Sequence, residues 1–297
     1  MSRPTDAGRP ADVIGRFTRL PLPSNSSTAA AMMEVGRRRH HVAGLGEIDV
    51  TDSRNAIREY RRKSGRGMSL TAWVVKCIGQ AVAEQPEVQA CRKGRRGLVV
   101  FEDVDVLVVV ERLVGSERVP LPYIVRRANT KSLQQVHDEI RSAQQQELTG
   151  REVSLGQAPT PWLAPLFRRL PQALQRIPFQ LVARRPFLAK RVQGTVGVTA
   201  VGMFGRFAGW PLTVGLHTLD FALGGVVKKP GVVGGRMAVR DYLRMTVLVD
   251  HDVVDGAPAA RFISRLTQLM ESGNGLDRLD AAQAGVQQQG TAPDSSA

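Results

Sequence analysis

Apolar positions recur with two different periods along this chain, and the change of period separates helices from strands. Between Ser69 and Pro86 they recur every three or four residues, which predicts an amphipathic helix with Ser69 or Thr71 as its N-cap and Pro86 at its end. Between Met237 and Val249 apolar and polar positions alternate, which predicts a half-buried strand. Elements of both kinds along one chain predict an α/β fold.

The same patterns predict the remaining elements. A strand over 47–51 leads into a basic helix, for which Thr51 or Asp52 is the N-cap. A helix over 129–146 carries His137 beside its apolar face, as an ordinary surface or boundary residue. The predicted turns, all rich in glycine or proline apart from the first, are 115–116, 202–209, 224–225, 230–231 and 234–235. The first of these turns separates two β segments.

Length and composition allow one sizeable core. The 297 residues are 42% hydrophobic and 23% charged, which fits one large domain or two small ones. We predict a flexible segment over 1–35, a folded domain over 36–272 and a disordered tail over 273–297. No apolar run approaches the roughly 18 residues of a membrane span, and the N-terminus lacks the apolar region of a signal peptide, so we expect a cytoplasmic protein. The two cysteines, Cys77 and Cys91, form no disulfide framework and no metal-binding spacing.

The net charge of +14 at pH 7 predicts an anionic partner. Aromatic residues make up only 5% of the chain, and no pattern of interleaved arginines and aromatic rings is present, which argues against nucleic acid. An acidic membrane surface and a phosphorylated ligand such as coenzyme A remain.

Residues 158–192 combine six prolines and seven basic residues with no acidic one. This composition predicts short amphipathic helices separated by proline. Three uses fit it: a membrane-surface segment with Trp162 as an interfacial anchor, a helical hairpin that packs on its own domain or on a neighbouring subunit, and a lid at an acceptor entrance. The pattern leaves the three open.

The end of the last predicted strand carries the main chemical signal. His251 follows that strand, Asp255 and Gly256 come next, and Pro258 opens an amphipathic helix. An imidazole with a pKa of about 6.5 suits a general base at neutral pH. Taken alone, the pair of His251 and Asp255 is also compatible with a purely structural role for the histidine. The other histidines considered, at positions 40, 41 and 217, are interpreted as structural.

Four stretches resemble, in order, the chloramphenicol acetyltransferase-like superfamily, and most closely the catalytic domain of the acyltransferase component of 2-oxo acid dehydrogenase complexes. Residues 250–256 resemble its D-H-R-x-x-D-G signature, with Asp252 in place of the arginine. The other stretches, which resemble its first strand, its helix ending in P-x-x-N-A and its G-T-F-T-I-S-N-L-G-M-F-G strand and turn, are 40–51, 69–90 and 194–205. The resemblance implies a two-layer mixed β-sheet with flanking helices, a catalytic domain over 36–272 and an insertion at about 155–193.

The resemblance also implies roles for individual residues. His251 would take the proton of a thiol, either of coenzyme A or of a dihydrolipoyl acceptor. Thr199 stands where the family has a serine or threonine that stabilises the oxyanion. Asp255 would stabilise the active-site loop by pairing with a basic side chain, while Gly256 and Gly202 are assigned to substrate binding.

The resemblance further implies a homotrimer, with the histidine of one chain facing the hydroxyl residue of the next. Acyl-coenzyme A would be the substrate, with no metal, and the acceptor would be a separate lipoyl-bearing protein or another small molecule, because no lipoyl-attachment hairpin precedes residue 36. Asp252 would add to the carboxylates around His251 and raise the pKa of the imidazole. The alternative function is therefore a catalytically silent trimeric scaffold, associated with a membrane surface through residues 158–192.

Overall fold

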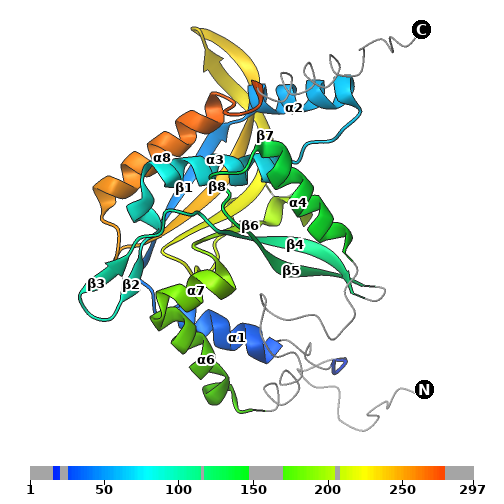
Figure 1. The fold of residues 1–297 in the computed structure, drawn as a ribbon. Coiled ribbons are helices and arrows are strands. Elements are labelled where there is room, and N and C mark those ends of the chain that lie inside the picture. Colours follow the sequence, from blue (N-terminus) through cyan, green and yellow to red (C-terminus); the bar gives the residue numbers. More distant parts are fainter. Residues whose placement is uncertain (1–15, 21–25, 115–116, 147–169, 205–207, 278–297) are drawn as a thin grey trace, which may run out of the picture.

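The structure is a computed structural model that describes residues 16–20, 26–114, 117–146, 170–204 and 208–277 (Figure 1). Its main sheet has six strands in the order β1-β8-β7-β6-β4-β5. These strands are β1 (His41–Asp49), β4 (Val106–Val114), β5 (Glu117–Val125), β6 (Val196–Ala200), β7 (Leu219–Val233) and β8 (Arg236–Asp250). β6 runs parallel to both β4 and β7, and the other pairs are antiparallel, so the sheet is mixed, as expected. A separate hairpin consists of β2 (Cys91–Lys93) and β3 (Gly97–Val99).

Helices pack on one face of the main sheet and enclose the core (Figure 1). The helices of this layer are α2 (Thr51–Ser64), α3 (Leu70–Glu84), α4 (Leu133–Gln145) and α8 (Gly256–Glu271), with the short 3₁₀ helices η1 (Pro86–Gln89) and η3 (Val201–Phe204) in the connections. Trp73, Phe221 and Phe262 are among the largest side chains that this packing buries completely. The α/β architecture predicted from the alternation of periods is confirmed.

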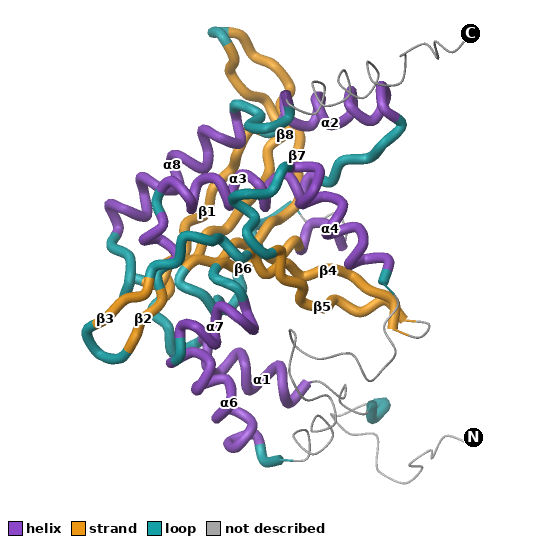
Figure 2. The backbone as a smooth tube through the Cα atoms, in the orientation of Figure 1, coloured by secondary structure: helices purple, strands orange, loops and turns teal. Residues whose placement is uncertain are grey.

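A second group of helices lies at the other end of the molecule (Figure 2). α1 (Ser26–Gly36) packs against α6 (Gln172–Arg184), which leads into α7 (Pro186–Gln193), and α7 contacts β2. The short helices predicted for residues 158–192 are therefore confirmed in their second half, although Pro178 lies inside α6 instead of separating two helices. The first segment, predicted as flexible over 1–35, is corrected: its alanine-rich end has high helix propensity and finds α6 as a packing partner.

The two helices predicted from apolar spacing in the first half of the chain are confirmed. Ser69 is the N-cap of α3, and its side chain accepts a hydrogen bond from the Ala72 N–H. Ser132 and Gln135 form a capping box at the start of α4. His137, expected at the surface or at its boundary, is instead 7% exposed, because its Nδ1 accepts from the Ser69 N–H at 3.0 Å and thereby joins the two helices. Burial lowers the pKa of this imidazole.

The start of α2 differs from the prediction. The N-cap is Val50, which offers no side-chain bond, and neither Thr51 nor Asp52 takes that position. The Asp49 carboxylate accepts instead from both the N–H and the hydroxyl of Thr51, at 2.9 and 2.6 Å. The Asp49 carboxylate therefore takes the place of an N-cap side chain, because it accepts the hydrogen bond of a backbone N–H in the first turn of the helix.

The β7–β8 hairpin corrects two predicted turns. β7 continues through Pro230 and Gly231, and the chain reverses at Gly234 and Gly235, whose φ angles of 57° and 78° favour glycine. Pro230 is tolerated because this part of β7 has only β8 as a neighbour, so one strand edge is free. The glycines at 224–225 form an irregularity within β7 and not a turn.

The predicted tail is corrected at its beginning. Leu276 is buried in the core, and the indole N–H of Trp73 donates to the carbonyl of Asn274 at 3.1 Å. The rest of the tail, most of the first segment, the loop at 115–116 and the part of the insertion that contains Trp162 lie outside the described residues.

Candidate active site

His251 stands at the bend that joins β8 to α8, as the sequence predicts. Asp250, the last residue of β8, pairs with His41 of β1, and the His251 N–H donates to the carbonyl of His40 at 3.0 Å. These contacts anchor the backbone of the histidine to the start of β1, while its side chain is exposed. Among the described residues its imidazole makes no hydrogen bond or ion pair, so the ring is accessible to a ligand or to another chain.

Asp252, which stands in place of the expected arginine, has partners of its own. Its Oδ1 lies 2.9 Å from Nδ1 of His40, and its Oδ2 accepts from the Arg92 guanidinium at 2.9 Å. The hydrogen bond with His40 is the main cause that lowers the pKa of the Asp252 carboxyl, and the same bond raises the pKa of His40. Asp252 thus links the start of β1 to the β2–β3 hairpin.

Asp250 is held in a similar way. Its Oδ2 accepts from Arg39 at 2.9 Å, and its Oδ1 accepts from the Asp252 N–H at 3.2 Å. Two of the carboxylates that were expected to gather around His251, Asp250 and Asp252, are therefore bound to the side chains of neighbouring segments and to the backbone of the bend. The bend is rigid on both sides of the histidine.

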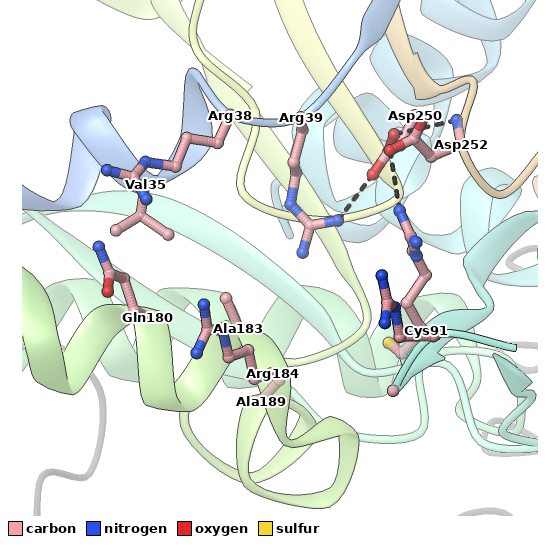
Figure 3. A pocket seen from close by; sticks show the side chains of 13 residues that line it. Val35, Arg38, Arg39, Cys91, Gln180, Ala183, Arg184, Ala189, Asp250 and Asp252 are labelled. Carbon is pink, nitrogen blue, oxygen red and sulfur yellow. Dashed lines mark hydrogen bonds and ion pairs between the residues drawn. The ribbon is translucent and has the colours of Figure 1, made fainter. Parts of the chain in front are cut away.

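A cavity of about 590 Å³ opens beside this bend (Figure 3). Five arginines line it, together with both aspartates: Arg38, Arg39, Arg92, Arg95 and Arg184. They come from three places in the chain, namely the stretch after α1, the β2–β3 hairpin and the end of α6. Within the described part of the chain Arg38, Arg95 and Arg184 have no carboxylate partner, so the cavity carries excess positive charge and suits an anionic ligand.

No pattern along the sequence places these arginines together. The signal was present as Arg37–Arg39 and Arg92–Arg96, two groups of arginines that each lie next to a stretch resembling the family. Their shared position follows from the pairing of β1 with β8, which no local pattern specifies.

Thr199 lies on β6, away from His251. Its neighbours Val198 and Ala200 are buried in the core, so the Thr199 side chain points to the opposite face of the sheet, where it is half-buried. β6 is two strands from β8, and Thr199 stands level with Thr246. With strand spacings of about 4.8 Å and about 3.3 Å per residue, the Cα atoms of Thr199 and His251 are roughly 20 Å apart. One chain does not bring the two predicted catalytic groups together.

Asp255 and Gly256 mark the start of α8. Asp255 is its N-cap but makes no capping bond, and no basic side chain pairs with it among the described residues. The predicted loop-stabilising pair is therefore absent from this part of the chain. Gly256 does not have a positive φ, and a Cβ at this position would meet nothing within 4 Å, so no tight backbone depends on it.

Gly202, assigned to substrate binding, serves close packing here. A Cβ at this position would lie 2.2 Å from the carbonyl oxygen of Gly224, so only glycine lets η3 approach the irregularity of β7 this closely.

The remaining histidines are structural, in keeping with the prediction. His217 Nδ1 lies 2.7 Å from Oδ1 of the buried Asp220, and its Nε2 lies 3.0 Å from the carbonyl of Gln193. Both ring nitrogens thus have hydrogen-bond partners. Burial raises the pKa of Asp220, but the charge interaction and hydrogen bonds with His217 outweigh this effect, so the pKa is lowered overall. His41 Nε2 bonds to the carbonyl of His217 at 2.9 Å.

Comparison with known proteins identifies the family that the sequence motifs resemble. The family model of the 2-oxoacid dehydrogenases acyltransferase (catalytic domain) matches residues 17–154 and 188–276. The match omits most of the predicted insertion.

Among curated proteins, the lipoamide acyltransferase component of the branched-chain alpha-keto acid dehydrogenase complex of Bacillus subtilis is 22% identical over 78% of this chain and 47% of its own length. The corresponding component of Pseudomonas aeruginosa is 22% identical over 82% of this chain and 49% of its own length. The chain thus spans about half the length of these relatives.

Among solved structures, the Azotobacter vinelandii dihydrolipoamide acetyltransferase, studied for the roles of a serine, a histidine and an asparagine in its catalytic mechanism, aligns with a TM-score of 0.63. The sequences are 18% identical over 89% of this chain and 95% of that chain. A probable dihydrolipoamide acetyltransferase of Listeria monocytogenes aligns with a TM-score of 0.60 and 18% identity, over 86% of this chain and 95% of the other. The predicted fold is confirmed.

Proposed function

We propose that this chain, which belongs to the 2-oxoacid dehydrogenases acyltransferase (catalytic domain) family, transfers an acyl group between coenzyme A and a lipoyl-type thiol or another small acceptor. The observation that carries the proposal is the exposed imidazole of His251, held by its backbone beside a cavity rich in arginine. The candidate base thus lies between two residues that line a binding site for an anionic substrate, Asp250 and Asp252.

The spacing of three residues supports the assignment of roles. In the Azotobacter vinelandii enzyme the histidine under study follows the serine by 52 residues and precedes the asparagine by four. Thr199, His251 and Asp255 keep both spacings. Thr199 retains the hydroxyl group of the serine, and His251 retains the histidine. Asp255 has a carboxylate where the relative has the amide of asparagine, so Asp255 is the residue that differs in chemistry.

The proposed chemistry is thioester exchange. His251 takes the proton of the attacking thiol, whose pKa of about 8.5 leaves it mostly protonated at neutral pH. The thiolate attacks the thioester carbonyl, and the Thr199 hydroxyl donates a hydrogen bond to the oxyanion of the tetrahedral intermediate. Collapse of the intermediate expels the second thiolate, which receives the proton from the imidazolium. No other reactant is needed, since one thiol and one thioester are exchanged for another pair.

The two groups would meet across a subunit boundary. Within one chain His251 and Thr199 are roughly 20 Å apart, so a homotrimer in which the histidine of one protomer faces the threonine of the next supplies both. The exposed side chains of Val42 and Leu45 on β1, each 55% exposed, leave apolar surface for such a contact. The related pyruvate dehydrogenase structure, which is a cubic core, supports assembly.

The arginine-lined cavity supports coenzyme A as the acyl carrier. Its arginines can bind phosphate groups with charge-assisted hydrogen bonds, and the three without carboxylate partners, Arg38, Arg95 and Arg184, are available for this. A volume of about 590 Å³ accommodates part of a ligand of that size. The cavity thus accounts for some of the net positive charge of the chain.

Acyl transfer from acetyl-coenzyme A to dihydrolipoamide tests the proposal. We expect His251→Ala to lower kcat about 10²- to 10⁴-fold, because it removes the general base. Gln145→Ala at the exposed end of α4 serves as the control and should keep the wild-type rate. Longer acyl chains and other thiol, hydroxyl and amine acceptors should be included, because the acyl group and acceptor are open.

The same experiment decides the alternative of a silent scaffold. Asp252 in place of the family's arginine, with its carboxylate bound to His40 and Arg92, is the observation that favours it. Equal background rates for the wild type and His251→Ala with every donor and acceptor would reject the enzymatic proposal in favour of the scaffold.

A further inference from the structure

The outer face of α6 carries exposed apolar side chains. Leu174, Ile177 and Leu181 lie three and four residues apart on one side of the helix and are 46%, 55% and 43% exposed. Pro178, also exposed, lies beside them. We call these four residues the α6 stripe. A helix on a folded domain normally turns such a stripe inward, so the α6 stripe indicates an apolar partner outside the fold.

The inner side of the helix confirms this orientation. Gln175 is 1% exposed, and its side-chain amide donates to the Leu170 carbonyl at 2.8 Å. Arg176 forms an ion pair with Glu34 of α1 at 3.8 Å. Gln175 and Arg176 therefore lie on the inner side of the helix together with the half-buried Phe179 and Val182, whereas the apolar side chains of the α6 stripe face outward.

The charges around the stripe are of one sign. No acidic residue occurs between Glu152 and Asp220. Arg185, directly after α6, and Arg191 on α7 are exposed and lie outside the lining of the arginine-rich cavity. An apolar stripe next to exposed arginines is the pattern of helices that lie in the interface of an anionic bilayer, with aliphatic side chains in the acyl boundary and guanidinium groups at the phosphates.

The family comparison argues against a second protomer as the partner of the stripe. The family match omits residues 155–187, which include all of the α6 stripe. A contact shared by the assemblies of the family cannot depend on a segment outside the family match. In addition, no helix in the described ranges is long and apolar enough to cross a bilayer, so the expected contact is peripheral.

We infer that the α6 stripe and the arginines beside it bind the surface of a membrane that contains anionic lipids. The stripe inserts its aliphatic side chains below the headgroups, and the arginines bind lipid phosphates. This role is independent of acyl transfer, and it can hold for an active enzyme or for a silent scaffold.

Flotation of the full chain with vesicles tests the inference. The protein should float with equimolar phosphatidylglycerol and phosphatidylcholine but not with phosphatidylcholine alone, and raised salt should weaken the binding. The triple variant Leu174→Ser, Ile177→Ser, Leu181→Ser should reduce vesicle affinity about tenfold or more. The matched control Leu98→Ser, Leu113→Ser, Leu212→Ser removes three other exposed leucines and should leave binding unchanged.

Three results would overturn the inference. The first is absence of flotation with anionic vesicles, and the second is equal flotation of the wild type and the α6 variant. The third is an α6 variant that keeps vesicle binding but changes its sedimentation coefficient or loses thermal stability, since the stripe would then contact another protomer or another part of its own chain. Acyl transfer rates measured in the same samples keep this outcome separate from the fate of the proposed function.

Discussion

At the scale of single residues, the polar groups around His251 divide into those that hold the bend and those that remain available. Asp250 and Asp252 bind Arg39 and Arg92, while the imidazole of His251 is left exposed. Asp252, which stands in place of the family's arginine, forms an ion pair with Arg92 of the β2–β3 hairpin.

The contact between His40 and Asp252 should depend on pH. The pKa of His40 is raised by Asp252, so the stabilisation is fully present below the unfolded pKa of about 6.5 and is lost as pH rises through the higher folded value. We expect the coupling between the two residues, from a double-mutant cycle of His40→Ala and Asp252→Asn on urea unfolding, to be larger at pH 5.5 than at pH 8.5.

Arg92 provides the control for this cycle on the same carboxylate. It stays charged over this range, so the coupling of Arg92→Ala with Asp252→Asn should change little between the two pH values. A His40 coupling that is as large at pH 8.5 as at pH 5.5 would contradict the assigned partner.

At the scale of elements, the close approach of Asp220 on β7 and of His217 just before it explains why β6 has a glycine at position 197. A Cβ at Gly197 would lie 1.9 Å from Asp220 Oδ1 and 2.8 Å from His217 Nδ1. The buried pair of His217 and Asp220 therefore fills the space above β6. Helix and strand patterns predict the strand but not this contact, because it depends on a carboxylate 23 residues further along the chain.

Gly197→Ala should lower the free energy of unfolding by about 3 kcal/mol or more, since the methyl group must displace a buried ion pair. Urea unfolding measures the effect. Gly256→Ala is the matched control and should stay within about 0.5 kcal/mol of wild type, because its Cβ meets nothing within 4 Å. Comparable losses for the two variants would show that the packing at Gly197 is not as described.

At the scale of the whole molecule, the separation of Thr199 from His251 makes oligomerisation a requirement of the proposed chemistry. Each chain contributes half of two different sites in the proposed trimer. An inactive histidine variant and an inactive threonine variant can then complement each other, which two variants of a site within one chain could not do.

Mixed trimers of His251→Ala and Thr199→Ala test this arrangement. Each variant alone should lose activity, with Thr199→Ala costing about 10²- to 10³-fold in kcat and Thr199→Ser retaining most of it. After coexpression with two affinity tags, the purified mixed trimers should recover about a third of the wild-type sites, because one of the three subunit boundaries in each mixed trimer joins an intact histidine to an intact threonine. Mixed trimers no more active than the parent variants would mean that the two residues do not share a site.

The sequence by itself determined the local elements and the position of the candidate base. Apolar spacing and caps predicted α3 and α4, and strand alternation led β8 to His251, because these signals depend on neighbours a few residues away. The same local signals predicted the observed turn at 234–235, but they also predicted turns at 224–225 and 230–231, where β7 continues, since strand pairing and not composition decides how far β7 extends.

Only the tertiary structure decided which distant groups meet. Arg39, Arg92 and Arg184 share one cavity because the register of β1 on β8 and the packing of α6 on α1 bring their elements together. The outward face of α6 was likewise undecided until packing against α1 fixed which side of the helix is buried. The physical reason is that burial and strand register are properties of contacts between elements, and a period along one element does not specify its neighbour.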